Sequence, residues 1–457
     1  MNEELILAKQ QAFFYSGKTK PYAFRAGALE ALKKAVIRHE KALSDALRKD
    51  LNKSAFDAYA TEIGILLSEL SFTLKHLKRW MKPERAKTPL THAGSKSMIV
   101  PEPYGTALII SPWNFPLQLS LVPLVGAVAA GNCAVIKPSE YTPHTSKALK
   151  KLVEEIFPED LVAVIEGGVE TSRALLELPF DKIFFTGSVP VGKIVMEAAA
   201  RRLTPLTLEL GGKSPCIVHE DAKIKLAAKR IAWGKFLNAG QTCIAPDYVY
   251  VHQNIKTAFF KELEGAVHEL YGEQPLGNPD YTRIVSDKHF SRLRGFLEEG
   301  ETVFGGGFKE EERIIEPTVL TGITWENKVM QEEIFGPVLP VLEYESLDEV
   351  VGAVRRYEKP LALYLFSGDR AVQDRIMNEL SFGGGSINDT VYHFTSPYLP
   401  FGGVGASGMG TYHGKESFNA FSHRKSVLRQ TTTFDIPFRY PNVKNGLKKI
   451  KKFLKYV

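Results

Sequence analysis

The pattern of apolar and polar positions predicts a helical first section followed by a break. Over Glu30–Leu51 and Tyr59–Trp80, apolar side chains recur every three or four residues, with Lys, Arg and Glu between them. We therefore expect residues 1–80 to be helical. A segment with two prolines follows at 82–90, and Ser97–Val100 is a short strand candidate.

The next 34 residues, 103–136, carry no charged side chain. We do not predict a membrane-spanning helix here, because three prolines and several amide side chains interrupt the segment. Instead, we predict a buried strand over Gly105–Ile110, a helix over about Leu117–Ala130 and a buried strand over Cys133–Lys137. Uncharged strands of this kind are typical of parallel sheets covered on both faces.

Helices then alternate with short apolar strands along most of the remaining chain. The predicted helices are 146–156, 171–176, 191–201, 224–236 and 255–271, and the predicted strands are 162–166, 182–186, 205–210, 216–218 and 248–251. This alternation predicts the α/β class, with two successive doubly wound α/β units. A binding site is expected between the two units.

Length and composition agree with an ordinary enzyme of more than one domain. The chain has 457 residues, of which 44% are hydrophobic and 24% charged. Its three cysteines match no zinc spacing and cannot all pair, so we expect a reducing, cytoplasmic setting and no bound metal. The first 20 residues contain early acids and no cleavable apolar core, which argues against a signal peptide.

The formal net charge of +6 belongs to the C-terminal tail. Residues 436–457 contain Arg439 and six lysines but no acids, and the rest of the chain has a net charge of −1. A neutral body gives no electrostatic basis for nucleic-acid binding.

The tail also has an amphipathic pattern. On a helix over Val443–Val457, at about 100° per residue, one face collects Leu447, Ile450, Phe453, Leu454 and Val457, while lysines cover much of the rest. Two interpretations remain open: peripheral contact with the inner face of a membrane, or docking of the apolar face on the protein.

Three residues stand out as candidates for chemistry. Cys243 follows a predicted helix and a glycine-containing loop, where backbone amides would lower its pKa and favour the nucleophilic thiolate. Glu209 ends a predicted strand before two glycines, a suitable place for a general base. Asn114 lies in a loop fixed by prolines, where its amide would face a developing oxyanion. Each residue also has an alternative interpretation when considered alone. Cys243 could be a buried structural cysteine, Glu209 a solvated carboxylate in a turn, and Asn114 a cap of the following helix.

Seven motifs in order resolve these alternatives. The chain contains SPWNFP, NCAVIKPSE, FFTGSVPVGK, LELGGKSP, GQTC, EEIFGPV and PFGGVGASG. In sequence and spacing it resembles the aldehyde dehydrogenase superfamily, and most of all the class 3 branch, which lacks the N-terminal extension of longer classes. The resemblance implies an NAD(P)-dependent enzyme that oxidises an aldehyde to the carboxylic acid through a cysteine thioester, and a homodimer.

The resemblance also implies a division of the chain. The expected parts are a dinucleotide-binding domain (1–94 and 106–210), a catalytic domain (211–422), a small bridging and oligomerisation sheet (95–105 and 423–434) and the basic amphipathic tail (435–457).

Residue roles follow from the motifs. Cys243 matches the nucleophile, Glu209 the general base and Asn114 the oxyanion amide, which the Cys243 N–H assists. The implied cofactor-binding residues are Trp113, Lys137, Ser139, Glu140, Gly187, Ser188, Val191, Gly192, Leu210, Glu333 and Phe335. Glu333 is also an alternative base. Because a carboxylate such as Glu140 binds ribose hydroxyls and repels a 2′-phosphate, NAD is favoured, with NADP also tolerated through Lys137.

A second glycine pattern, Gly403-x-Gly405-x-x-Gly408, lacks the strand, helix and downstream acid of a dinucleotide fingerprint, and we interpret it as a loop near the active site. The predicted substrate pocket contains Phe115, Leu119, Leu237, Thr395 and Phe401. These mostly apolar residues favour an aliphatic or aromatic aldehyde. Two other functions remain as alternatives: a CoA-acylating dehydrogenase, and a non-catalytic structural protein derived from the family.

Overall fold

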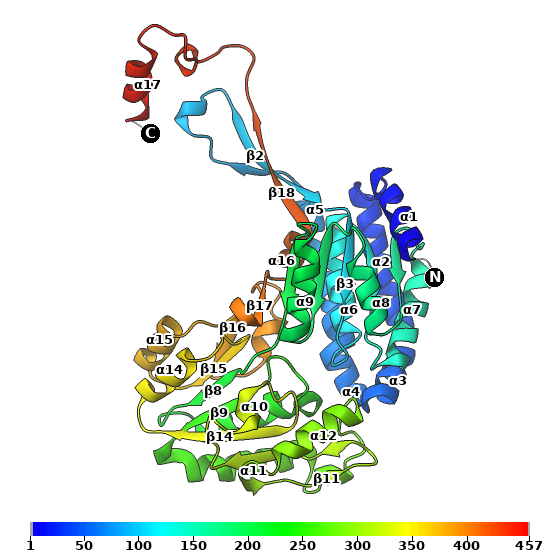
Figure 1. Ribbon diagram of the computed structural model, residues 1–457, viewed down its shortest axis with the longest axis vertical. Helices are drawn as coiled ribbons and strands as arrows, with labels where there is room; N and C mark the ends of the chain where they lie inside the picture. Colours follow the sequence, from blue (N-terminus) through cyan, green and yellow to red (C-terminus); the bar gives the residue numbers. More distant parts are fainter. Residues whose placement is uncertain (1–2, 456–457) are drawn as a thin grey trace.

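The computed structural model describes residues 3–455 and contains two large sheets and a small antiparallel arm (Figure 1). The first sheet has the order β17-β7-β6-β3-β4-β5. Its strands are β3 Thr106–Ile110, β4 Cys133–Lys137, β5 Val162–Val164, β6 Lys182–Thr186, β7 Leu206–Glu209 and β17 Gly408–Met409. The five longer strands are parallel, and β17 pairs antiparallel with β7. Strand order reverses between β3 and β6, which creates a crevice at their carboxyl ends.

Helices cover both faces of this sheet. They are α1 Glu3–Tyr15, α2 Tyr22–Arg38, α3 Glu40–Leu51, α4 Ala55–Ala58, the π-helical η1 Tyr59–Ile63, α5 Gly64–Trp80, α6 Gln118–Ala130, α7 Pro143–Ile156, α8 Val169–Leu176, α9 Val189–Ala200 and α16 Lys415–Ala420. All thirteen residues of α6 are buried. The uncharged segment is therefore interior to the protein, as its pattern predicts.

The N-terminal helices differ from the expectation at two points. The predicted helix Glu30–Leu51 is divided at His39, whose backbone (φ −97°, ψ 8°) leaves the helical region. The predicted helix Tyr59–Trp80 begins with the π-helical turn η1. A π-turn is often found at functional sites, and it disturbs the apolar spacing too little to be visible in the sequence.

The second sheet has the order β10-β13-β14-β9-β8-β15-β16 and is parallel except for β10. Its strands are β8 Pro215–Val218, β9 Tyr248–His252, β10 Glu301–Phe304, β13 Thr318–Thr321, β14 Val338–Tyr344, β15 Ala362–Phe366 and β16 Gly384–Ile387. Its helices are α10 Ile224–Phe236, α11 Lys256–Tyr271, α12 Asp287–Phe296, α13 Lys328–Gln331, α14 Leu347–Arg355 and α15 Arg370–Glu379. Shorter elements are β11 Phe308–Lys309, β12 Ile314–Ile315, η3 Leu237–Gly240, η4 Gln253–Ile255, η5 Pro275–Gly277, η6 Tyr392–Thr395 and η7 Gly405–Ser407.

After the second sheet the chain returns to the first. Gly408 of β17 pairs with Glu209 of β7, and α16 packs on α6. The predicted catalytic range 211–422 includes these residues, but β17 pairs with a strand of the first sheet. Gly403–Gly408 passes through η7 into β17 and does not lead into a helix, in agreement with its interpretation as a loop.

An antiparallel arm projects from the body (Figure 1). It consists of β1 Glu84–Ala86, β2 Lys96–Pro103 and β18 Ser422–Arg429, with register running from Ser422↔Pro103 to Arg429↔Lys96. The turn η2 Leu90–His92 lies between β1 and β2. Because β18 is the terminal strand of this sheet, its outer edge is available for pairing.

The tail continues from the arm through η8 Pro437–Arg439 to helix α17 Gly446–Leu454, which lies near the arm's far end (Figure 1). This helix is shorter than the predicted 443–457, and Val457 lies outside the described residues. Leu447 and Leu454 are 69% and 58% exposed. Across residues 3–455, no helix combines the length and apolarity needed to cross a membrane.

Candidate active site

The candidate site lies where the two α/β units meet. The carboxyl ends of β3, β6 and β7 deliver Asn114, Gly187 and Glu209 from the first unit. The loops before β9 and β14 deliver Cys243 and Glu333 from the second. All five residues line one cavity of about 560 Å³. Ligands of open α/β sheets bind at this kind of strand end.

A tight loop positions Cys243. Asn238 and Ala239 have positive φ angles of 56° and 52°, and a Cβ atom at Gly240 would collide with the Gly336 carbonyl. The Gln241 side chain fixes the turn by donating to the Asn238 carbonyl (3.0 Å) and accepting from the Val285 N–H (3.1 Å). The loop that carries the thiol is thus held from both sides.

The Cys243 thiol differs from the sequence-based expectation. Burial raises the pKa of Cys243 above its usual range, and the carboxyl groups of Glu333 and Glu209 raise it further. Backbone amides of Cys243 and Ile244 act in the opposite direction, as expected, but burial dominates. The predicted lowering by backbone amides is therefore present but is outweighed by burial and by the two carboxyl groups. A base must remove the thiol proton before Cys243 reacts.

Glu209 carries a buried carboxyl group at the cavity wall. Glu209 is 3% exposed, and neither of its carboxyl oxygens has a hydrogen-bond partner among residues 3–455. Burial raises the pKa of Glu209 well above its ordinary value. An unpartnered buried carboxyl group is costly, and such groups concentrate at functional sites.

Glu333 also lines this cavity. Burial raises the pKa of Glu333 to about 8, and Asp247 adds to the effect while the Gly212 amide and Lys213 oppose it. Its carboxyl group lies against Gly211, where a Cβ atom would not fit. Arg292 donates to the Glu333 carbonyl (3.1 Å) and so fixes the backbone of this segment.

The candidate cofactor residues divide into two sets. Trp113, Gly187, Ser188, Leu210, Glu333 and Phe335 line the 560 Å³ cavity, and the rings of Trp113 and Phe335 meet edge to face at 5.3 Å. Lys137, Ser139, Glu140, Val191 and Gly192 do not line it. Of these, Lys137 donates to Glu140 Oε2 (2.8 Å) at the end of β4.

The start of α9 is suited to a phosphate group. No side chain caps this helix, so its first amides are available to an anion. A Cβ atom at Gly192 would lie 2.6 Å from Leu210 Cδ2, so glycine permits α9 to approach β7. The buried Thr186 hydroxyl also lacks a partner beside this turn. These features fit a dinucleotide.

A second cavity of about 420 Å³ reaches Cys243 from the other side. All five predicted substrate residues line it: Phe115, Leu119, Leu237, Thr395 and Phe401. Cys243 and Leu119 line both cavities. The thiol therefore lies where a substrate in one cavity and a cofactor in the other would meet.

Several lining residues were not found from the sequence. Trp233 and Phe394 line the substrate cavity, and His289, Arg292 and Lys213 line the other. Their positions depend on folding of distant segments, and only Lys213, next to the glycine pair, had a sequence signal. Within residues 3–455 no group of three or more His, Cys, Asp or Glu side chains is arranged to hold a metal ion.

Comparison with known proteins agrees with this geometry. The aldehyde dehydrogenase family profile matches residues 3–427. The chain is 51% identical over 447 residues to the 4,4'-diaponeurosporen-aldehyde dehydrogenase of Staphylococcus aureus, covering 97% of both proteins. It is 45% identical to the mouse protein named "Aldehyde dehydrogenase, dimeric NADP-preferring", covering 93% of this chain and 94% of the relative.

Among solved structures, the substrate-bound state of Staphylococcus aureus AldH superposes with a TM-score of 0.97 at 50% identity, covering 99% of this chain and 100% of that one. Together with the profile match over most of its length, this shows that the chain belongs to the aldehyde dehydrogenase family.

Proposed function

We propose that this aldehyde dehydrogenase oxidises an apolar aldehyde to its carboxylic acid through a thioester on Cys243, with Glu209 as the base for hydrolysis. The single observation that carries the proposal is the placement of Cys243 at the junction of the two cavities. Oxidation of aldehydes to acids is the activity of the family to which the chain belongs.

In the first step the Cys243 thiol loses its proton to water in the 560 Å³ cavity, and the thiolate sulfur bonds to the aldehyde carbon, whose C=O double bond becomes a C–O⁻ single bond. The resulting oxyanion accepts hydrogen bonds from the Asn114 amide and the Cys243 N–H. Asn114 Nδ2 donates one hydrogen to the Gln241 carbonyl at 3.1 Å, which leaves its second hydrogen for the oxyanion. The C=O bond re-forms as a hydride leaves the same carbon, which leaves a thioester on Cys243; NAD(P)⁺, when bound, would be the acceptor of that hydride.

Glu209 then takes a proton from a water molecule that attacks the thioester carbonyl. The C–S bond breaks, the acid leaves, and Cys243 is restored. The raised pKa of Glu209 makes its carboxylate a stronger base than an exposed glutamate. Glu333 is the second candidate, because its raised pKa and its place on the cavity wall are similar.

We propose NAD as the preferred cofactor, with NADP accepted. Glu140, which follows β4, would bind ribose hydroxyls, and Lys137, its ion-pair partner, would tolerate a 2′-phosphate. The first amides of α9 would hold the pyrophosphate, and Glu333 with Phe335 would hold the nicotinamide riboside. A relative named as NADP-preferring supports acceptance of both forms.

The substrate cavity supports an aliphatic or aromatic aldehyde. Its walls are mainly aromatic and aliphatic, including Phe115, Trp233, Phe394 and Phe401, and its volume is about 420 Å³. Asp57 lies among the lining residues, and its negative charge would disfavour an acidic semialdehyde. The alternatives of CoA transfer and of a non-catalytic role are not favoured, because Cys243, Asn114 and Glu209 lie around one cavity.

The test is a rapid-mixing measurement of NADH. C243S should bind NAD normally and produce no burst, because an alcohol is a far weaker nucleophile than a thiolate. E209Q should give a stoichiometric burst followed by slow turnover, since hydrolysis alone is impaired. The control C133A changes a cysteine at the opposite end of the parallel strands and should behave as wild type. Retention of more than about a tenth of the turnover by C243S would reject the covalent mechanism.

Two interactions of the whole protein are part of the proposal. The free outer edge of β18 supports a homodimer in which the arms of two copies pair. The exposed Leu447 and Leu454 beside the lysines of α17 support a peripheral, salt-sensitive contact with the anionic inner face of a membrane.

A further inference from the structure

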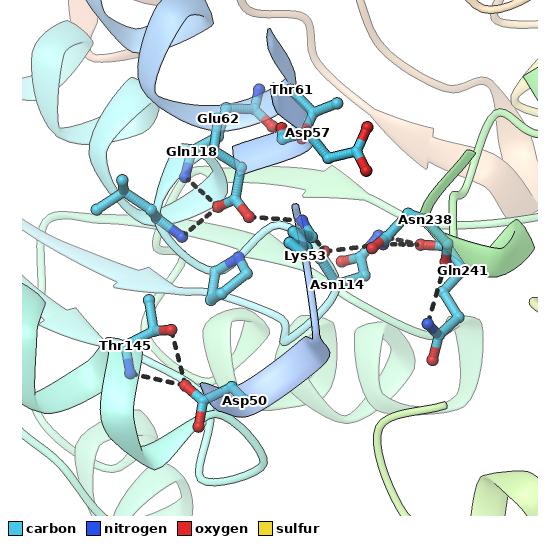
Figure 2. A network of polar contacts seen from close by, with 12 residues as sticks. Asp50, Lys53, Asp57, Thr61, Glu62, Asn114, Gln118, Thr145, Asn238 and Gln241 are labelled. Atoms are coloured by element: carbon cyan, nitrogen blue, oxygen red, sulfur yellow. Dashed lines mark hydrogen bonds and ion pairs between the residues drawn. The ribbon is translucent and has the colours of Figure 1, made fainter. Parts of the chain in front are cut away.

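A buried ion pair lies directly behind Asn114 (Figure 2). Lys53 and Glu62 are 1% and 0% exposed, and Lys53 Nζ lies 2.5 Å from Glu62 Oε1. Neither residue belongs to a motif that the sequence singled out. Lys53 lies in the loop between α3 and α4, and Glu62 lies on the π-helical turn η1.

Glu62 connects this pair to helix α6. Its second oxygen accepts hydrogen bonds from the amides of Leu117 (2.8 Å) and Gln118 (3.2 Å) at the start of the helix. A carboxylate at this end satisfies otherwise unpaired amides and interacts favourably with the helix dipole. Glu62 therefore fixes the segment that directly follows Asn114.

Lys53 connects the pair to Asn114 itself. Its ammonium group donates to the Asn114 carbonyl (2.9 Å) and lies 4.2 Å from the centre of the Phe115 ring. The same carbonyl accepts from Asn238 Nδ2 (3.0 Å), which belongs to the Cys243 loop. The Asn114 backbone is thus held between the first unit, through Lys53, and the second, through Asn238 (Figure 2).

Stability alone is a poor explanation for the pair. Removing two charges from water costs about as much as their attraction returns, so an uncharged pair of similar size is often as stable. A fixed ammonium group does, however, restrict the carbonyl to one position. A displacement of about 1 Å at a catalytic group can reduce the rate about 100-fold.

We infer that Lys53 and Glu62 are positioning residues that hold the Asn114 backbone so that its side-chain amide meets the oxyanion formed at Cys243. This inference rests on the oxyanion role proposed for Asn114. Lys53 and Glu62 act through Asn114 and do not touch the substrate.

The test uses K53M/E62Q, which removes both charges together so that no unpaired charge is buried. The glutamine oxygen can still accept from the amides that start α6. We expect NAD affinity and the KM for aldehyde to change less than about threefold. The first-turnover NADH burst should slow about 10- to 100-fold. A second neutral pair, K53L/E62Q, also buries no unpaired charge; it should slow the burst in the same direction, and it provides a second measurement should K53M/E62Q be unstable.

Two further variants separate positioning from general loss of packing. R25M removes another buried cation, which donates to the Ala129 carbonyl (3.2 Å) near the far end of α6, and its burst rate should stay within about twofold of wild type. In an N114A background, K53M/E62Q should have almost no additional effect, because the amide that it positions is absent.

The outcomes are distinguishable. An unchanged burst in K53M/E62Q, or an equal additional loss in the N114A background, would overturn the positioning role and leave the function of Asn114 intact. An R25M loss as large as that of the double variant would also overturn it. A normal burst in N114A alone would instead overturn the proposed role of Asn114, and this inference with it.

Discussion

Replacing Glu333 with glutamine tests how strongly burial affects the carboxyl groups of the site. The wild-type carboxyl group has a pKa of about 8, compared with an ordinary value of 4.5, mainly because it is buried. Below pH 4.5 the carboxyl group is protonated in both the folded and the unfolded chain, so it does not reduce the free energy of unfolding. As pH rises from 4.5 to 8, the unfolded chain releases its proton first, and the folded protein loses relative stability. Above pH 8 both forms are ionised and the loss stays constant.

The size of this loss of folding stability follows from the difference between the folded and unfolded pKa values, at about 1.4 kcal/mol for each pKa unit. At pH 7 the penalty is about 3 kcal/mol, and above pH 8 it reaches about 5 kcal/mol. Glutamine has the same shape and does not ionise, so E333Q should avoid this penalty. With about 2 cal/mol/K of unfolding entropy per residue, 1 kcal/mol corresponds to about 1 °C in this chain. E333Q should therefore melt about 3 °C above wild type at pH 7.

The assay is thermal melting of both proteins from pH 5 to 9, expressed as the difference in melting temperature. The difference should grow with pH and level off near 8. The control E332Q alters the neighbouring residue, whose side chain is 56% exposed, and its curve should remain parallel to that of wild type. If the E333Q and wild-type curves are also parallel, the buried carboxyl group does not hold its proton and the reasoning fails. A more stable E333Q with a higher KM for NAD would show that the site sacrifices stability for cofactor binding.

Three other predictions concern cofactor choice, assembly and the tail. E140Q should raise the ratio of kcat/KM with NADP to that with NAD at least about fivefold, since it removes the charge that repels a 2′-phosphate; an unchanged ratio would exclude Glu140 as the selecting group. Light scattering should give twice the 50.9 kDa chain mass, whereas a clean monomer at micromolar concentration would contradict the proposed dimer. The full chain should sediment with anionic vesicles at low salt, and a chain truncated after Tyr440 should not; equal binding by both would remove the case for α17 as a membrane contact.

Regular elements could be predicted closely from the sequence. Strand β6 and helix α10 have the predicted bounds, because each combines a clear apolar pattern with distinct ends. The five predicted substrate residues also line one cavity, although only Phe115 and Phe401 lie within the seven motifs. The site residues remain predictions of function, although the structure places the three catalytic candidates around one cavity.

Other features depend on tertiary structure that a local pattern does not encode. The separation of α2 from α3 at His39 leaves the apolar spacing almost intact. The raised pKa of Cys243 results from burial and from two carboxyl groups that are distant in sequence. In the sequence, Lys53 resembles an ordinary charged loop residue and Glu62 an ordinary surface residue of an amphipathic helix, yet packing buries both. For such residues, the local sequence shows the charge of the side chain but does not show whether it is buried or which groups it contacts.

The late return of the chain to the first sheet has a consequence for synthesis. Until β17 emerges from the ribosome, β7 is an uncovered edge, and its last residue is Glu209. An uncovered edge strand is a site for incorrect pairing with other chains. A nascent chain that already contains Cys243 and Glu209 therefore still lacks the strand that completes the sheet beside the base. Ribosome stalling or truncation before residue 408 should leave an aggregation-prone intermediate, so the last tenth of the polypeptide acts as a closing step in biogenesis.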